Sequence, residues 1–229
     1  MVPLMRTVLL LSLAAACGRE AGGAAVSRAW PVLGTTMSAA AWGADTARIG
    51  RALASVRDTV DRPPPGRAVA VDSLRREIRL RTGVAVAAAD LTEGDALDRA
   101  AMMLAGVVDS ALLDIGGQFL WVGRQGTRRP VGIADPTNTL DAVATVEMRS
   151  GSVSTSSHPG PSLSVTVLAS SGVAADAWST ALVEIGCDRA LALAPQLETW
   201  QASLVCADSS GVRWTPDLEG RVLVRPPRP

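Results

Sequence analysis

The run Val173–Gly186 constrains the fold more than any other part of the chain. Its residues are mostly apolar and it ends at a glycine, which predicts a helix, with a second helix over Asp188–Leu197. Asp176 and Thr180 lie four residues apart in this run. On a helix, that spacing puts both side chains on one face, with their Cβ atoms about 5–6 Å apart.

Asp176 and Thr180 both offer hard oxygen ligands, which suit Mg²⁺ better than a soft or imidazole-seeking metal. They also lie in the first turns of the expected helix, where the positive end of the helix dipole and the unpaired N–H groups favour a phosphate. A simpler interpretation of the same residues is an aspartate that caps the helix and a threonine that faces the core. The pair alone leaves both interpretations open.

The rest of the chain mixes strand and helix patterns without a strict βαβ alternation. This order predicts an α+β fold, a mixed β-sheet core with packed helices. Further helices are expected over Asp45–Asp61, which Asp45 can cap, and over Asp90–Gly106. Extended segments or strands are expected over Ala29–Trp42, Ala68–Val71, Glu77–Arg81, Val84–Ala88, Ser110–Ile115, Gln118–Gly123, Pro130–Ala134, Ala142–Met148, Ser152–Ser154, Leu163–Ala169, Gln201–Ala207 and Val212–Thr215.

Size and charge narrow the class of protein. The 229 residues suffice for one sizeable domain, and a hydrophobic content of 48 % suffices for a core. The 22 basic residues balance the 22 acidic ones without a basic tail or stripe, so nucleic-acid binding is disfavoured. Every one of those basic residues is an arginine; therefore no lysine can act as a base or form a Schiff base.

The N-terminus has the pattern of a bacterial export signal. Arg6 precedes the apolar stretch Thr7–Ala16, which is too short for a membrane span of about 20 residues. Small residues then precede Cys17, as in a lipoprotein signal whose cysteine is lipidated, although an ordinary secretion signal would also export the domain. We expect a lipid anchor on the periplasmic side of a bacterial membrane. The expected organisation is a signal over 1–17, a tether over 18–27, a single domain over 28–220 and a disordered tail over 221–229.

The remaining cysteines, Cys187 and Cys206, have two interpretations. Export permits a disulfide between them, and two buried free thiols are the alternative. The chain has no CxxC motif and only one histidine, His158, so a zinc site is unsupported and a multi-histidine metal site is excluded.

Five segments are distinctive, in order along the chain: residues 32–38, 93–100, 112–123, 153–157 and 164–186. Together they resemble motifs of the ApbE family, the FAD:protein FMN transferases. Residues 32–38 are similar to its MGTTYS-type motif, with Leu33 in place of methionine, and residues 93–100 to its [KE]GYAVDRA motif, with Asp95 in place of the aromatic residue. Residues 112–123, 153–157 and 164–186 resemble the motifs LVDLGGDIRALG, VATSG and SVTVIA…ADALSTALFVLG. The resemblance extends from about Val32 to about Gly220 and implies an ApbE-like fold.

The resemblance also implies a function. Enzymes of this family use a divalent cation, here Mg²⁺, to transfer FMN from FAD to a threonine of a target protein, and they release AMP. The expected partners are therefore FAD as substrate, a flavin-accepting protein, and the membrane through the lipid anchor, without any nucleic acid.

Carried over residue by residue, the resemblance makes Asp176 and Thr180 metal ligands and thereby catalytic residues. A backbone carbonyl at Asp90 would complete the metal site, with Leu91 or Thr92 as alternatives. Asp98 would pack or support the site, or be a solvated carboxylate. The residues expected to bind the cofactor are Leu33, Glu93, Gly116, Gly117 and Val167, although the two glycines also suit a simple tight turn.

Parts of the family pattern are missing. The region between Asp61 and Ala68 is a short proline-rich stub, and the family's YRPDSEI and PTVGPL segments, which contact the flavin and the adenine, have no match. Ala87 stands where the family has an acidic residue, and His158–Pro161 is either a remnant of its HHIIDPRTG segment or a surface turn. These departures keep two alternatives open: a non-catalytic flavin-binding or partner-docking module, and an FAD pyrophosphatase that uses water in place of threonine.

Overall fold

The computed structural model describes residues 24–60, 67–123, 128–137, 141–158 and 163–225. Eight strands form the central sheet: β1 (Ala24–Val32), β2 (Thr35–Gly43), β3 (Ser110–Ile115), β4 (Gln118–Gly123), β7 (Gly151–His158), β8 (Leu163–Ala169), β9 (Ser203–Asp208) and β10 (Gly211–Trp214). They lie side by side in this order, and each neighbouring pair is antiparallel.

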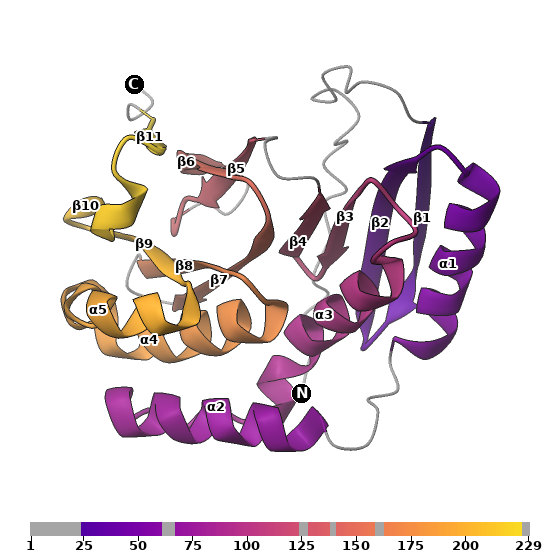
Figure 1. Cartoon of the computed structure of the whole chain (residues 1–229). Helices are drawn as coiled ribbons and strands as arrows, with labels where there is room; N and C mark the ends of the chain where they lie inside the picture. Colours follow the sequence, from indigo (N-terminus) through magenta and orange to yellow (C-terminus); the bar gives the residue numbers. More distant parts are fainter. Residues whose placement is uncertain (1–23, 61–66, 124–127, 138–140, 159–162, 226–229) are drawn as a thin grey trace, which may run out of the picture.

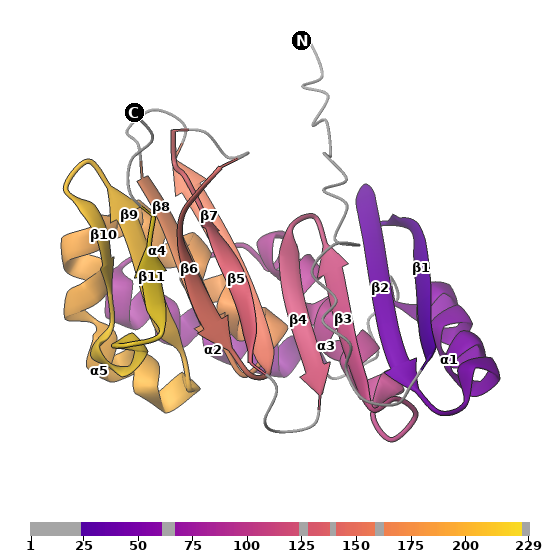
Figure 2. The same cartoon turned by 90° about the horizontal axis from the view of Figure 1, so that it is seen from above.

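A smaller sheet covers part of one face of the central sheet (Figure 2). Its strands are β5 (Arg129–Ala134), β6 (Ala142–Met148) and β11 (Val222–Val224), in the order β11-β6-β5. Ile133 and Val146 of the small sheet pack against Trp121, Val153 and Leu168 of the central sheet. The antiparallel β-rich architecture with separate helices confirms the predicted α+β class.

The helices lie on the opposite face of the central sheet (Figure 1). The long ones are α1 (Thr46–Thr59), α2 (Arg67–Thr82), α3 (Thr92–Leu104) and α4 (Gly172–Ala192). Helices α1 and α3 share a core with β1–β4, whereas α2 packs on the outside of α4. The short helical segments are η2 (Ala88–Leu91), α5 (Ala194–Leu197), η3 (Glu198–Trp200) and η4 (Pro216–Leu218).

Several local predictions are confirmed. The Asp45 side chain caps α1, because it accepts a hydrogen bond of 2.8 Å from the N–H of Arg48. Strand β8 has the predicted bounds, and β3 and β4 form the predicted pair. Gly186 interrupts α4 as predicted, because its φ of 77° is not helical.

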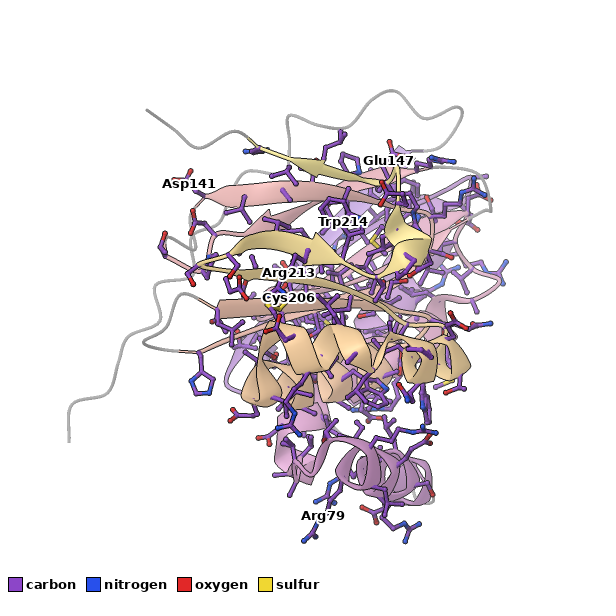
Figure 3. All side chains as sticks on the ribbon, turned by 90° about the vertical axis from the view of Figure 1, so that its left-hand side faces the viewer. Arg79, Asp141, Glu147, Cys206, Arg213 and Trp214 are labelled. Carbon is purple, nitrogen blue, oxygen red and sulfur yellow. A yellow bond between two sulfur atoms is a disulfide. The ribbon has the colours of Figure 1, made fainter. Side chains whose placement is uncertain are left out.

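The strands predicted over Ala68–Val71 and Glu77–Arg81 are wrong, because both segments belong to α2. The apolar residues Val71, Leu74 and Ile78 recur every three or four positions, and this stripe packs on α4. The strand predicted over Val84–Ala88 is also absent: residues 84–87 have no regular structure, and η2 follows. Arg79 is exposed and points away from this stripe (Figure 3).

Three other expectations about segment boundaries also differ from the structure. Strand β1 starts at Ala24, inside the span 18–27 expected as a tether, because residues 24–27 pair with β2. The segment expected to be extended over Ala29–Trp42 is a hairpin, since β1 and β2 are joined by a turn at Leu33–Gly34. β11 lies within the tail that we expected to be disordered, and Val222 is buried there.

The predicted signal, residues 1–17, lies outside the described residues. Among the described residues, no helix is long and apolar enough to cross a membrane.

The structure resolves the interpretation of the two cysteines. Cys187 and Cys206 form a disulfide that joins α4 to β9, and both residues are buried (Figure 3). Because Cys187 follows Gly186 directly, the bond holds the part of α4 beyond the interruption.

We expect the double substitution Cys187→Ala/Cys206→Ala to lower the free energy of unfolding by about 3 kcal/mol, because it removes the constraint on a loop of 19 residues in the unfolded chain. Urea unfolding with and without dithiothreitol measures this. The reductant should destabilise the wild type and leave the double variant unchanged. If dithiothreitol leaves the free energy of unfolding of the wild type unchanged, the expectation is wrong.

Asp95, which stands where the family motif has an aromatic residue, forms a buried ion pair within α3. Its Oδ2 atom lies 2.9 Å from Nε of Arg99, and both side chains are almost fully buried. Nη1 of Arg99 also donates a hydrogen bond of 3.3 Å to the carbonyl of Thr59 near the end of α1. The aspartate is thus the anionic partner of a buried arginine that links two helices.

Asp95→Ala should lower the free energy of unfolding by about 3–5 kcal/mol, because it leaves the Arg99 guanidinium buried without its carboxylate. The double variant Asp95→Ala/Arg99→Met should recover most of that loss, since it removes both charges. Chemical unfolding of the two variants and the wild type tests this; equal stability of the single and double variants would refute it.

Candidate functional site

Two tight turns lie at one end of the central sheet. β2 pairs with β3 so that Met37 is opposite Ile115, which brings the turn at Leu33–Gly34 close to the turn at Gly116–Gly117. Leu33 has a φ of 50° and is partly exposed, and the two glycines have φ values of 61° and 94°. Three of the residues predicted to bind the cofactor therefore lie at the same end of the fold.

The turn after β3 is stabilised by Asp114. Its Oδ1 atom accepts a hydrogen bond of 3.0 Å from the N–H of Gly117. Burial raises the pKa of this carboxyl, while that hydrogen bond opposes the shift. A Cβ atom at Gly116 would lie 2.9 Å from Oε1 of Glu93, so this carboxylate lies directly against the turn, and the φ of 61° favours glycine there.

Asp176 lies beside the start of α3. It is 9 % exposed, and its Oδ2 atom accepts a hydrogen bond of 3.2 Å from the N–H of Gly94. Burial raises its pKa to about 7; the Gly94 N–H opposes this shift, and the negative charges of Glu93 and Asp90 add to it. The charges of Glu93 and Asp90 thus act on Asp176 from positions more than eighty residues earlier in the chain, although the sequence analysis had selected Asp90 for its backbone carbonyl. We call Asp176, Glu93 and Asp90 the acidic cluster.

Thr180 lies one helical turn after Asp176 and is partly exposed, so it does not face the core. The cap of α4 is Ser171, whose Oγ accepts a hydrogen bond of 3.2 Å from the N–H of Ala174. The simpler interpretation, with Asp176 as a cap and Thr180 in the core, is therefore wrong.

Asp98 also binds the first turn of α4. Its carboxylate accepts hydrogen bonds of 2.5 Å from the N–H of Gly172 and 3.2 Å from that of Val173. It is therefore neither solvated nor a direct part of the acidic cluster. Because Asp98 and Ser171 already bind the N–H groups at the start of α4, these groups are not available to a phosphate, contrary to our expectation.

The start of α4 packs unusually close to α3. A Cβ atom at Gly94 would lie 2.5 Å from the carbonyl oxygen of Gly172, and a Cβ at Gly172 would lie 2.4 Å from that of Gly94. Nε2 of Gln118 donates a hydrogen bond of 2.8 Å to the same Gly172 carbonyl. The sequence analysis did not select Gly172 or Gln118; the similarity of residues 112–123 to a family motif is the one sequence feature that pointed to Gln118.

Val167 does not join the site through its side chain. It is fully buried between the sheet and α4, among the core residues of β8. Its backbone pairs with Ser154 on β7 and Leu204 on β9. The prediction that Val167 binds the cofactor is therefore not supported for its side chain, because alternation along β8 turns it into the core.

The acidic cluster suits a hard cation. Among the described residues, Asp176 forms no ion pair, and no group of three or more His, Cys, Asp or Glu side chains is arranged to hold a metal ion. A buried carboxylate next to two further negative groups is stabilised by a divalent cation, and Thr180 offers a hydroxyl one turn away. The donor set expected from the sequence, one carboxylate, one hydroxyl and a backbone carbonyl, needs no third acidic side chain and is therefore compatible with this arrangement.

His158, the last residue of β7, contacts α4. Its Nε2 lies 3.4 Å from Oε2 of Glu184, which follows Thr180 by one helical turn, and both side chains are exposed. Residues 159–161, the remainder of the proposed motif remnant, lie outside the described residues.

A cavity of about 720 Å³ lies at the opposite end of the strands. It is lined by Met102, Trp121, Met148, Ser170 and Arg221, among others, and by Asp98. Neither Asp176 nor Thr180 lines it, so this cavity is separate from the acidic cluster.

The comparisons with known proteins agree with the motifs and with the fold. A family model described as "ApbE family" matches residues 10–160, which is more than half of the chain. The chain belongs to the ApbE family. No curated protein matches its sequence.

Solved ApbE structures share the fold of this chain at low sequence identity. The ApbE protein of Thermotoga maritima MSB8 has a TM-score of 0.63 and 16 % identity, with 86 % of this chain and 99 % of that chain covered. The flavin transferase ApbE of Vibrio cholerae has a TM-score of 0.61 and 14 % identity, covering 87 % and 100 %. The apo flavinyl transferase ApbE of Pseudomonas stutzeri has a TM-score of 0.61 and 17 % identity, covering 87 % and 97 %.

The raised pKa of Asp176 predicts a dependence of stability on pH. The folded protein keeps this proton up to about pH 7, whereas the unfolded chain loses it near the ordinary value of 3.8. The free energy of unfolding should therefore fall by about 4 kcal/mol between pH 4 and pH 7 through this group alone.

Asp176→Asn should remove this part of the pH dependence and be more stable than the wild type above pH 7. Urea unfolding between pH 4 and pH 8 in the presence of EDTA measures the effect. The exposed Asp109→Asn is the matched control and should follow the wild type. If the free energy of unfolding of Asp176→Asn depends on pH in the same way as that of the wild type, the folded Asp176 is ionised over the whole range from pH 4 to pH 8, and the prediction is wrong.

Proposed function

We propose that this ApbE-family protein transfers FMN from FAD to a threonine of a target protein in a reaction that depends on Mg²⁺. The main support is the position of the buried Asp176 at the start of α3, where its carboxylate accepts a hydrogen bond from the N–H of Gly94, and the next residue back, Glu93, lies against the Gly116 turn. The solved proteins of similar fold that are named flavin transferases support the same reaction class. In this reaction the threonine oxygen attacks the FMN phosphorus, the bond to the AMP oxygen breaks, and the hydroxyl proton is released.

In this proposal Asp176 and Thr180 hold Mg²⁺ together with the backbone carbonyl of Asp90. The cation neutralises the pyrophosphate charge and polarises the phosphorus. Asp176 must lose its proton to become a ligand, so cation binding should release a proton near pH 7. Glu93 and the backbone of Gly116 and Gly117 contact the FAD that lies against this end of the sheet.

A non-catalytic flavin-binding or docking module is the second candidate. One observation favours it: the segments by which the family grips flavin and adenine have no match, and α2 fills the sequence between α1 and η2. An FAD pyrophosphatase, with water as the acceptor, is the third possibility that the experiment below separates.

We also propose that the domain acts outside the cytoplasm, held to the periplasmic side of a membrane through a lipid on Cys17. The Cys187–Cys206 disulfide supports this location, because disulfides persist in oxidising compartments. Its flavin acceptor would then be another exported protein.

The decisive experiment mixes protein expressed from Gly18 onward with FAD, Mg²⁺ and an acceptor domain that carries the target threonine. AMP release and the mass of the acceptor are measured. AMP with a gain of one FMN on the acceptor supports transfer, AMP alone supports hydrolysis, and flavin binding without AMP supports the module.

Asp176→Ala should lower the rate of Mg²⁺-dependent AMP release by about 100-fold or more, because a metal ligand contributes several kcal/mol of transition-state stabilisation. Asp188→Ala, on the same helix but at an exposed position, is the control and should retain the wild-type rate. Circular dichroism verifies that both variants are folded. Full activity of Asp176→Ala would exclude it as a metal ligand.

A further inference from the structure

Three serines join α4 to β7 next to the acidic cluster. The Oγ of Ser179 lies 3.0 Å from the Oγ of Ser154 and 3.0 Å from that of Ser156. Ser179 is fully buried and Ser154 nearly so. We call these three residues the serine bridge.

The hydrogen bonds of the serine bridge have a direction. The Ser156 hydroxyl donates to Ser179 Oγ, and the Ser179 hydroxyl donates to Ser154 Oγ. Ser179 Oγ also lies 3.1 Å from the backbone carbonyl of Asp176, which is a second acceptor for the same proton. The bridge therefore connects β7 to the peptide group of the candidate metal ligand.

Hydrophobic burial sets the rotation of α4 about its axis only coarsely. Val173, Thr180 and Glu184 are the less buried positions on one side of its first turns, whereas the buried apolar side chains cover the rest: Ala174, Ala175, Ala177, Trp178, Ala181, Leu182 and Val183. The hydrophobic effect is not directional, so this burial alone does not fix the helix at one angle. Hydrogen bonds are directional, and the serine bridge supplies them at one point of the helix surface.

The serine bridge lies within the same turn as the candidate ligands. Ser179 follows Asp176 by three residues and directly precedes Thr180. A small rotation of α4 would therefore move the Asp176 carboxylate away from Gly94 and carry the Thr180 hydroxyl with it.

We propose that Ser154, Ser156 and Ser179 are positioning residues that fix the rotation of α4, so that Asp176 and Thr180 present their oxygens to the same cation. This inference rests on the metal site proposed above. The three serines do not themselves contact the cation.

β7 provides a matched control on its other face. Thr155 lies between Ser154 and Ser156 and points the opposite way, where its hydroxyl bonds that of Thr166 on β8 at a distance of 2.8 Å. Thr155→Val therefore removes a strand hydroxyl of the same chemistry and leaves α4 untouched.

The test measures the affinity of the full chain for Mn²⁺, a substitute for Mg²⁺ whose free form is detected by electron paramagnetic resonance. Ser179→Ala should weaken Mn²⁺ binding about tenfold, and Ser156→Ala, which removes one hydrogen bond, should weaken it less. Thr155→Val should bind Mn²⁺ with an affinity within twofold of the wild type. Its melting temperature should still fall, because the substitution removes the hydrogen bond to Thr166. None of these measurements needs FAD or turnover.

The outcomes separate this inference from the proposed function. If the wild type binds no Mn²⁺, the proposed metal site fails and this inference fails with it. If the wild type binds Mn²⁺ and both serine variants bind equally well, only the positioning role is overturned. If Thr155→Val weakens Mn²⁺ binding as much as the serine variants do, the positioning role is also overturned, because general destabilisation would explain the effect. If Ser179→Ala does not fold, the comparison of Mn²⁺ affinity between Ser156→Ala and Thr155→Val decides.

Discussion

The close contact of α3 with α4 is the constraint on which the site depends. Gly94 and Gly172 allow the two backbones to touch, and Asp98 binds the first N–H groups of α4 from the side of α3. This contact brings the carboxylate of Asp176 to the N–H of Gly94 and close to Glu93. A side chain at either glycine would separate the helices and with them the two halves of the acidic cluster.

The acidic cluster lowers the stability of the folded protein, and interactions elsewhere in the fold must offset this loss. Burial is the main cause of the raised pKa of Asp176, and the negative charges of Glu93 and Asp90 add to it. Nearby buried polar groups are compensated: the buried Arg99 is paired with Asp95, and the buried Ser179 hydroxyl is hydrogen-bonded. An uncompensated carboxylate in such a fold is the expected mark of a binding site rather than of a stabilising element.

The sequence predicts the parts of the fold whose pattern is local. β8 and the interruption at Gly186 follow from strand alternation and from a glycine. α2 was missed because short apolar groups between arginines suit a strand as well as a helix, and contact with α4 decides between them. Asp176 was found from its helical spacing to Thr180 and from the family motif, and Asp90 and Glu93 through the resemblance alone. The role of Asp98 depends on a contact with residues more than seventy positions later, which no local pattern reveals.

The position of the disulfide divides α4 into two parts with different attachments. Beyond Gly186 the helix is held covalently to β9, whereas the part that carries Asp176 is held by the Asp98 cap and by hydrogen bonds to β7. Reduction would therefore loosen the far part of the helix first. A protein in a reducing environment would become easier for proteases to cut near Cys187 while the acidic cluster stayed assembled, so loss of the bond would shorten the lifetime of the protein before it altered its chemistry.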